Sequence, residues 1–435
     1  MTESHAEELL TPADAHDIYP ALARLRDEQP VDWCSWWGGW IVTRHADVVA
    51  GFRDPRLSAD RAGTFAARLP PPLRERLAPL LRNLSGWALI SDPPAHTRLR
   101  ALVNKAFTPR LAEQLRPRIR TVTHELIDAM RDEGPVDLIP ALANPLPVLV
   151  IGAMLGLPAS DRHRLKAWSD ALAQFLGAAA PTPEHASAAL RCVLELEAYF
   201  REVIAGRRES PGPDLISGLL AAEENGSVLH EQELLSTCTM VLFGGHETTT
   251  NLIANAVHLL LTHPEQRARL QRDPSLLPQA IEETLRFESP VARMGRVATE
   301  DIVWHGRTIK ADEKVWLSMA SANRDGRQFP APDHFDIARR DNRHLGLSTG
   351  PHYCVGAALG RAEAQIAVET LLRRFPTISL AHGAERSDNV TIRGFTRLPV
   401  FLGPESWAVP EDRIPEPAAT CPRGQADAPP DPRPA

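Results

Sequence analysis

Several features that define other protein classes are scarce in this chain of 435 residues. Only four of its 48 basic residues are lysines, and acidic residues outnumber basic ones, so the formal net charge is −7. This balance does not favour binding to nucleic acid or to an anionic membrane. The five cysteines lie far apart and form no Cys-x-x-Cys pair. The sequence therefore indicates neither a zinc site nor a redox dithiol.

Long hydrophobic runs are also missing. The most apolar stretch, residues 139–157, contains three prolines and an asparagine, which disfavour a membrane-spanning helix. The first residues are polar and acidic and lack the basic and apolar regions of a secretory signal. Because 43% of the residues are hydrophobic, a chain of this length can bury a large core. We expect a soluble, cytoplasmic globular protein with no membrane partner and no nucleic-acid partner.

Helical patterns dominate the sequence. We expect helices over 46–52, 96–131 with a break near Pro109, much of 146–262, 277–287 and 356–375. The longest uninterrupted candidate, 236–261, would be about 39 Å long at 1.5 Å per residue. Short strands are expected at 40–43, 297–299, 302–304, 315–318, 378–380 and 398–401. The fold class is therefore mainly α with small β-sheets, with one domain over 1–403 and a Pro-rich, disordered C-terminal tail over 404–435.

The most informative stretch surrounds Cys354. Gly350 permits a tight turn, and Cys354 comes directly before an apolar helix that begins near Gly356. A thiolate at that place would face free helix N–H groups, which lower the pKa of a thiol. Gly356 allows a flat ligand to approach the backbone, and His352 adds a basic group two residues before the cysteine. The alternative is a buried free thiol at the start of a helix.

This stretch resembles the haem-binding loop of the cytochrome P450 family, Phe-x-x-Gly-x-x-x-Cys-x-Gly. Gly350, Cys354 and Gly356 match the pattern, and His352 matches a common contact of a haem propionate. Leu347 stands where the family has Phe, and Ser348 where Gly is frequent. The resemblance implies that Cys354 is the axial ligand of the iron in haem b.

The long central helix breaks local rules at Gly244-Gly-His-Glu-Thr-Thr249. Each glycine in a helix costs about 1 kcal/mol relative to Ala, so the pair marks either a site or a close helix contact. The segment is similar to the oxygen-binding kink of the family. That similarity places Gly244 and Gly245 over the haem, makes Glu247 the acid of a proton relay, and makes Thr248 the hydroxyl beside dioxygen. His246 occupies a variable position.

Glu283 and Arg286 share one helix face at a spacing of three residues. Such a pair is most often a surface salt bridge of small energetic value. In the family it is the Glu-x-x-Arg element, and Arg339 stands where its downstream partner is expected. The resemblance implies that these three residues form a structural network that supports the cysteine loop.

His96 and Arg100 also share a helix face and suit a carboxylate ligand, although a solvated basic helix end would look the same. In bacterial members of the family, this His-x-x-x-Arg pair binds a haem propionate. Arg296 matches the other propionate arginine, with Arg293 as the alternative register.

The family resemblance implies a triangular prism of helices with the long central helix over a buried haem. The implied activity is that of a monooxygenase that hydroxylates, epoxidises or couples a medium-sized apolar molecule in bacterial natural-product or antibiotic biosynthesis. No flavin or Rossmann motif is present, so a ferredoxin and its NAD(P)H-dependent reductase would supply electrons, docking near Arg343 and Arg361 of a monomer. The alternatives are a peroxide-driven haem oxygenase and a non-catalytic recruitment module. By family position, the residues expected to line the substrate pocket, each of which could equally be plain core, are Trp87, Leu89, Phe175, Phe243, Val291, Ala292, Met294 and Phe395.

Overall fold

The computed structural model describes residues 6, 10, 16–130, 134–177, 182–222 and 226–405. The predicted tail over 404–435 therefore lies almost wholly outside the described residues, and the single domain over 1–403 stays a prediction. The predicted fold class is confirmed, because helices make up most of the described chain and the sheets are small. No described helix combines the length and the apolar character that crossing a membrane requires.

The longer helices carry most of the residues. They are α2 (Tyr19–Glu28), α3 (His45–Arg53), α4 (Arg61–Arg68), α5 (Pro71–Arg76), α6 (Ala78–Ser85), α7 (Ala95–Ala106), α8 (Pro109–Asp128), α9 (Pro145–Met154), α10 (Arg162–Gly177), α11 (Pro183–Glu209), α12 (Leu215–Ala221), α13 (Glu231–Thr262), α14 (Pro264–Arg272), α15 (Leu277–Phe287), α16 (Met319–Ala322) and α17 (Ala357–Arg374). Short 3-10 or π turns are η2 (Ala88–Ile90), η3 (Ile139–Ala143), η4 (Ala159–Asp161), η5 (Pro274–Leu276) and η6 (Gly350–His352).

The strands form one five-stranded sheet and three smaller ones. The large sheet has the order β1 (Val31–Cys34), β2 (Gly39–Val42), β8 (Lys314–Ser318), β5 (Arg293–Ala298), β3 (Leu57–Ser58). Within it, β2 and β8 are parallel, with Trp40 opposite Val315, and the other pairs are antiparallel. The smaller sheets pair β4 (Val136–Asp137), β12 (Pro399–Phe401) and β9 (Ser379–Leu380); β10 (Glu385–Arg386) and β11 (Phe395–Arg397); and β6 (Ile302–Trp304) and β7 (Arg307–Ile309).

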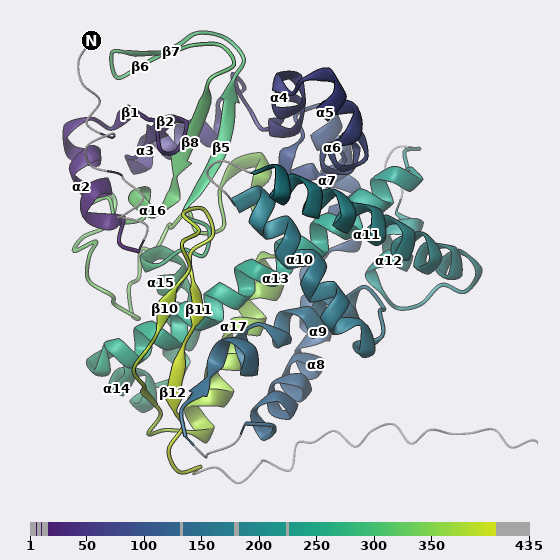
Figure 1. Ribbon diagram of the computed structural model, residues 1–435. Helices are drawn as coiled ribbons and strands as arrows, with labels where there is room; N and C mark the ends of the chain where they lie inside the picture. Colours follow the sequence, from purple (N-terminus) through teal and green to yellow (C-terminus); the bar gives the residue numbers. More distant parts are fainter. Residues whose placement is uncertain are drawn as a thin grey trace, which may run out of the picture.

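The helix α13 passes through the middle of the molecule, between the large sheet on one side and helices α4 to α12 on the other (Figure 1). Its 32 residues span about 48 Å, and its buried residues lie on all its faces, as expected for a helix enclosed by others. It begins five residues earlier than the sequence pattern predicts. The reason is local, since the carboxylate of Glu233 accepts a hydrogen bond of 2.9 Å from the His230 N–H and caps the first turn.

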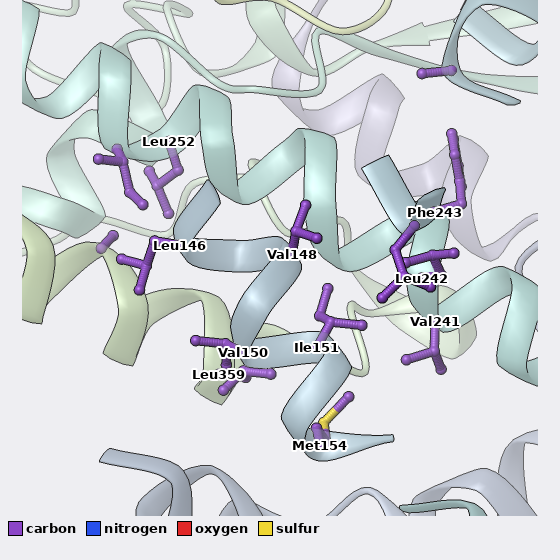
Figure 2. Packing of buried hydrophobic residues seen from close by; sticks show 14 of the residues in the cluster. Leu146, Val148, Val150, Ile151, Met154, Val241, Leu242, Phe243, Leu252 and Leu359 are labelled. Carbon is purple, nitrogen blue, oxygen red and sulfur yellow. The ribbon is translucent and has the colours of Figure 1, made fainter. Parts of the chain in front are cut away.

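Helix α9 packs against α13, and α17 packs against α13 further along (Figure 2). Leu146, Val148 and Ile151 of α9 lie in the same buried cluster as Leu242 and Leu252 of α13. Burial of such aliphatic side chains contributes roughly 1.5–3 kcal/mol each. This packing fixes the position of the central helix relative to the helix that follows Cys354.

Most predicted elements are found, with differences at their ends. The predicted helix over 277–287 is α15, and the expected break near Pro109 separates α7 from α8, where the Thr108 hydroxyl accepts a hydrogen bond of 3.2 Å from the Leu111 N–H. The strand β5 begins at Arg293, four residues before the predicted strand. Two buried arginines in β5 hide its apolar pattern in the sequence.

Candidate active site

Cys354 lies in the turn between η6 and α17, with its side chain on the wall of a largely apolar cavity. Its N–H donates a hydrogen bond of 3.0 Å to the Leu347 carbonyl, which closes the loop. Burial raises the pKa of the Cys354 thiol, and it outweighs the Gly356 N–H and the charges of Arg100 and Arg361. The N–H at the helix start does lower the pKa of the thiol, as predicted, but the net shift in the protein alone is upward, because burial disfavours the thiolate more strongly than these groups favour it.

The cysteine loop contains backbone strain at the position where it departs from the family pattern. Ser348 has a φ of 63°, a left-handed conformation that costs a residue with a side chain about 1–2 kcal/mol. Its hydroxyl is buried without a hydrogen-bond partner among the described residues. Gly350 has a φ of 71°, as its predicted role in the turn requires. Leu347, which replaces the family's Phe, lines the cavity.

The long helix α13 contributes Gly244, Gly245 and Thr248 to the lining of the same cavity. A Cβ on Gly244 would meet no atom within 4 Å, so the missing side chain leaves the cavity open there. A Cβ on Gly245 would lie only 2.4 Å from Cδ1 of Ile151 in α9. The two glycines thus act differently: the first leaves space for a ligand, and the second permits close packing of α13 on α9. The Thr248 hydroxyl donates a hydrogen bond of 2.7 Å to the Gly244 carbonyl.

Glu247 is not among the residues that line the cavity; it lies beside His246 and Asp170 of α10. Burial and the charge of Asp170 raise the pKa of Glu247. Asp170 pairs with the ammonium of Lys166, one turn earlier in α10. Burial lowers the pKa of His246 to about 4, so its ring is neutral at pH 7. In the predicted relay, Thr248 therefore lines the cavity, whereas its neighbour in the sequence, Glu247, does not.

Polar groups without partners gather around His352, which lines the cavity together with Arg100, whereas His96 and Arg296 are not among the lining residues. The rings of His96 and His352 lie 4.2 Å apart between centroids, and Arg296 and Arg100 lie beside them. Three nitrogens, His96 Nε2, His352 Nδ1 and Arg296 Nη2, are buried with no hydrogen-bond partner among the described residues. Burial, with a contribution from Arg296, lowers the pKa of His352 to about 3.

Such unpartnered donors are costly in a folded protein, at about 1–3 kcal/mol each. Asp92 is the nearby acid, but it already accepts hydrogen bonds from the Ser58 hydroxyl and, at 2.8 Å, from the Ala59 N–H. The donors therefore suit an added ligand that carries carboxylates, which are the acceptors that guanidinium and imidazole prefer. The chemistry of this donor set suits the two carboxylates of a haem. Arg293 lies elsewhere, between the rings of Trp37 and Trp316, so Arg296 is the arginine in the expected register.

Glu283, Arg286 and Arg339 form the predicted network, and Glu283 and Arg286 are fully buried rather than at the surface. Arg286 donates two hydrogen bonds of 2.8 Å to the Glu283 carboxylate, and Arg339 Nε lies 3.1 Å from Oε2 of the same group. Arg286 also donates to the Asn323 carbonyl at 2.8 Å. The Asn323 side chain accepts a hydrogen bond of 2.7 Å from the Leu345 N–H. This contact links the network to the cysteine loop.

Of the eight predicted pocket residues, five line the cavity: Trp87, Leu89, Phe243, Val291 and Met294. The other three lie elsewhere. Phe175 packs edge-on against Phe65, Phe395 packs against His258, and Ala292 is buried in the cluster around α2.

Two residues that lie close in the sequence to Phe175 and Phe395 line the cavity in their place. Leu176 stands beside Phe175 in α10, where one residue turns a helix by about 100°. Ile392 is held at the cavity by a bridge to Val291, three residues before Phe395. Sequence reasoning also missed Arg61, which lines the cavity but belongs to no quoted motif.

The family model for cytochrome P450 matches residues 79–399. The chain belongs to the cytochrome P450 family. It is 41% identical over 417 residues to Cytochrome P450 107B1 of Saccharopolyspora erythraea, covering 93% of this chain and all of that protein. It is 42% identical over 368 residues to Mycinamicin IV hydroxylase/epoxidase of Micromonospora griseorubida, covering 83% and 89% of the two chains. The predicted family, fold and enzyme class are thereby confirmed.

Solved structures of the family show the same fold. The structure of P450BioI in complex with a hexadec-9Z-enoic acid ligated acyl carrier protein matches with a TM-score of 0.83 and 36% identity, covering 89% of this chain and 98% of that one. As a cytochrome P450, this protein is a monooxygenase that uses a haem–thiolate cofactor.

Proposed function

We propose that Cys354 holds the iron of haem b as its thiolate ligand, and that the haem carboxylates lie at the cluster of His96, Arg100, Arg296 and His352. The observation that supports this most directly is that Cys354 lines the same cavity as Gly244 and Thr248 of the central helix. Coordination to a metal deprotonates a thiol outright, which overcomes the raised pKa of Cys354 in the protein alone. Haem with a thiolate ligand supplies dioxygen activation, with insertion of one oxygen atom into the substrate.

The residues of this chain supply shape and protons. Gly244 leaves the cavity open, and Gly356 at the start of α17 leaves the backbone free of a Cβ next to Cys354, where the cofactor would be held. Thr248 lines the cavity, and because its own hydroxyl proton goes to the Gly244 carbonyl, its oxygen lone pairs would be available to accept a proton. Burial raises the pKa of Glu247, which favours its protonated form relative to that of an exposed carboxyl, and Glu247 adjoins Thr248 in the sequence, so we assign it as the acid of the relay.

The lining of the cavity suits an apolar, medium-sized substrate. Trp87, Phe243, Met294 and Val291 present rings, a thioether and an aliphatic group to the cavity. A relative is named for hydroxylation and epoxidation of mycinamicin IV. We infer that this enzyme hydroxylates, epoxidises or oxidatively couples an intermediate of bacterial secondary metabolism.

Electrons would come from a ferredoxin and its reductase, which dock beside the cysteine loop. Tyr353, next to Cys354, is 41% exposed and marks this face. Of the two arginines expected to attract the partner, Arg361 is bound to the Glu282 carboxylate at 2.6 Å, and Arg343 is exposed but lies 2.9 Å from Asp341. Local acids therefore reduce the attraction that either arginine offers. The monomeric state and the cytoplasmic location stay predictions.

Turnover by the double variant Glu247→Gln, Thr248→Ala tests the proposed relay. With NADPH, ferredoxin and reductase, substrate oxidation should fall by about 10²-fold or more, the range typical of removing general acid–base groups. Oxidation driven by hydrogen peroxide should fall much less, because peroxide brings its own protons. Unchanged, well-coupled turnover with NADPH would contradict the relay. Peroxide-driven turnover that exceeds the ferredoxin-driven rate in the unmodified enzyme would favour the peroxide-dependent alternative.

A further inference from the structure

Arg61, the first residue of α4, extends its side chain to the wall of the cavity. The side chain crosses β5 at Gly295, where an added Cβ would lie 3.1 Å from the Arg61 Cδ. Met294, the residue before Gly295, lines the same cavity as Arg61. The charge of Arg61 also reaches Arg296 and His352 and contributes to lowering the pKa of both. The guanidinium of Arg61 therefore lies near the cationic cluster that contains these two residues.

No acid of the described chain neutralises this guanidinium. Arg61 makes no side-chain hydrogen bond with any described residue, and its Nε is buried without a partner. The groups that feel its charge are themselves cationic or basic: Arg296, Lys314 and His352. Burial lowers the pKa of Arg61 to about 10, so the group still carries its charge at pH 7.

Three buried arginines elsewhere in the described chain have a compensating partner. Arg393 lies 2.9 Å from the Glu288 carboxylate, and Arg286 lies 2.8 Å from Glu283. Arg293 has no carboxylate, but its charge is stacked between two indole rings at 4.1 Å from each centroid. Such stacking stabilises a buried cation. Arg61 has neither compensation, and its guanidinium is the one of these that opens on the cavity.

We propose that Arg61 binds a carboxylate inside the cavity, a role that extends the proposed haem site. A planar guanidinium matches a carboxylate with two parallel hydrogen bonds, and a desolvated pair of this kind is strong. Two carboxylates could reach this place: one carried by the haem, and one carried by an amphipathic substrate acid whose chain lies along Trp87, Leu89 and Met294. Both have the same chemistry, and separate measurements distinguish them.

The experiment uses Arg61→Leu and Arg61→Lys in the haem-loaded protein, with Arg68→Leu as the matched control. Arg68 is on the same helix and loses the same charge, but it is exposed and contacts only the Asp312 carbonyl among the described residues. The first measurement is the rate of haem release to excess apomyoglobin. The second is the affinity for dodecanoic acid and for dodecanol, followed by the spectral shift on binding.

Haem release that is about tenfold faster in Arg61→Leu, nearer normal in Arg61→Lys and normal in Arg68→Leu would assign the haem carboxylate. Unchanged release with an about tenfold loss of affinity for dodecanoic acid, and none for dodecanol, would assign a substrate carboxylate. Normal values for both in Arg61→Leu would overturn the proposal. Should that variant not fold, normal values for both in Arg61→Gln would overturn it.

Failure of the proposed function would look different, because the unmodified protein would then bind no haem. In that case the thermal midpoint of the haem-free protein with dodecanoic acid still tests Arg61. The acid should raise the midpoint of the unmodified protein and of Arg68→Leu but not that of Arg61→Leu. An equal rise in all three would overturn the proposal.

Discussion

Two groups of buried arginines in this molecule differ in one respect. Around Glu283, Arg286 and Arg339 direct their N–H groups at a carboxylate and at the carbonyls of Asn323 and neighbouring residues. In the cluster around His352, Arg296 and the two histidines beside it leave buried nitrogens without partners among the described residues. The first group is complete within the protein, as a structural network must be. The second is complete only when a ligand brings carboxylates.

This difference predicts opposite effects of substitution. Breaking the first group should destabilise the protein whether or not the cofactor is bound. Breaking the second should have little effect on the haem-free protein, or stabilise it, and should weaken cofactor binding.

The largest effect is expected for Glu283→Gln. Loss of this carboxylate leaves the charges of Arg286 and Arg339 buried and unpaired, which costs about 3–5 kcal/mol of the free energy of unfolding. Denaturant titration of the haem-free and haem-loaded protein should show a similar loss in both. The neighbouring Glu282→Gln is the control, because Glu282 is partly exposed and pairs with Arg361. A loss for Glu283→Gln no greater than that for Glu282→Gln would contradict the structural role.

The substitution Arg296→Met should behave in the opposite way. It removes a charge-assisted contact to the proposed haem carboxylate worth about 1.5–3 kcal/mol, so haem release should be at least tenfold faster. Haem-free protein should unfold at the same or a higher denaturant concentration, because a buried donor without a partner is removed. Arg286→Met, from the complete group, should instead destabilise both forms. Equal destabilisation of the haem-free protein by both variants would remove the distinction between the groups.

The pH dependence of stability should reveal the same difference between the two groups, through the protonation of His352. Its pKa is about 3 in the folded haem-free protein and about 6.5 in the unfolded chain. Between these two pH values the unfolded chain binds a proton at His352 that the folded protein does not bind. The contribution of neutral His352 to the free energy of unfolding is therefore fully present above pH 6.5 and is lost as the pH falls. The loss is at most about 1.4 kcal/mol per pH unit.

Urea titrations of haem-free protein between pH 6.5 and pH 4.5 should show a steeper loss for the unmodified protein than for His352→Gln. Exposed His163→Gln serves as the control and should follow the unmodified protein. Identical slopes for the unmodified protein and His352→Gln would show that His352 is not held neutral.

The smallest effect is expected at Ser348. Its left-handed backbone favours glycine, so Ser348→Gly should raise the free energy of unfolding by about 0.5–1 kcal/mol after the greater freedom of glycine in the unfolded chain is counted. Gly350→Ala, at a φ of 71°, should lower it by a similar amount. Thermal unfolding of both variants measures these two changes in stability. A stabilising Gly350→Ala would contradict the assigned backbone strain.

The sequence predicts those features that depend on neighbouring residues. They include the period of the long helix, the capped and Pro-interrupted helix starts, and the spacing of Glu283 and Arg286. The motif match around Cys354 identifies the cavity wall. The buried strand β5 is less visible, since Arg293 and Arg296 interrupt its apolar pattern.

Other features depend on distant contacts that no local pattern encodes. A side chain at position 245 is excluded because Ile151 of another helix lies too close. Arg61 reaches the cavity only because α4 packs over β5. Phe175 and Phe395 are large and apolar and lie near lining residues in the sequence, yet the rotation of a helix and the course of a loop turn them toward other partners. The net pKa of Cys354 likewise depends on burial by the whole fold.

The absorption spectrum of the dithionite-reduced, carbon-monoxide-bound protein reports directly whether Cys354 holds the haem iron as a thiolate. We expect the red-shifted Soret band that is characteristic of the family, and its loss in Cys354→Ser. A band at shorter wavelength in fully folded, haem-loaded protein, or an unshifted red band in Cys354→Ser, would contradict the assignment of Cys354 as the thiolate ligand.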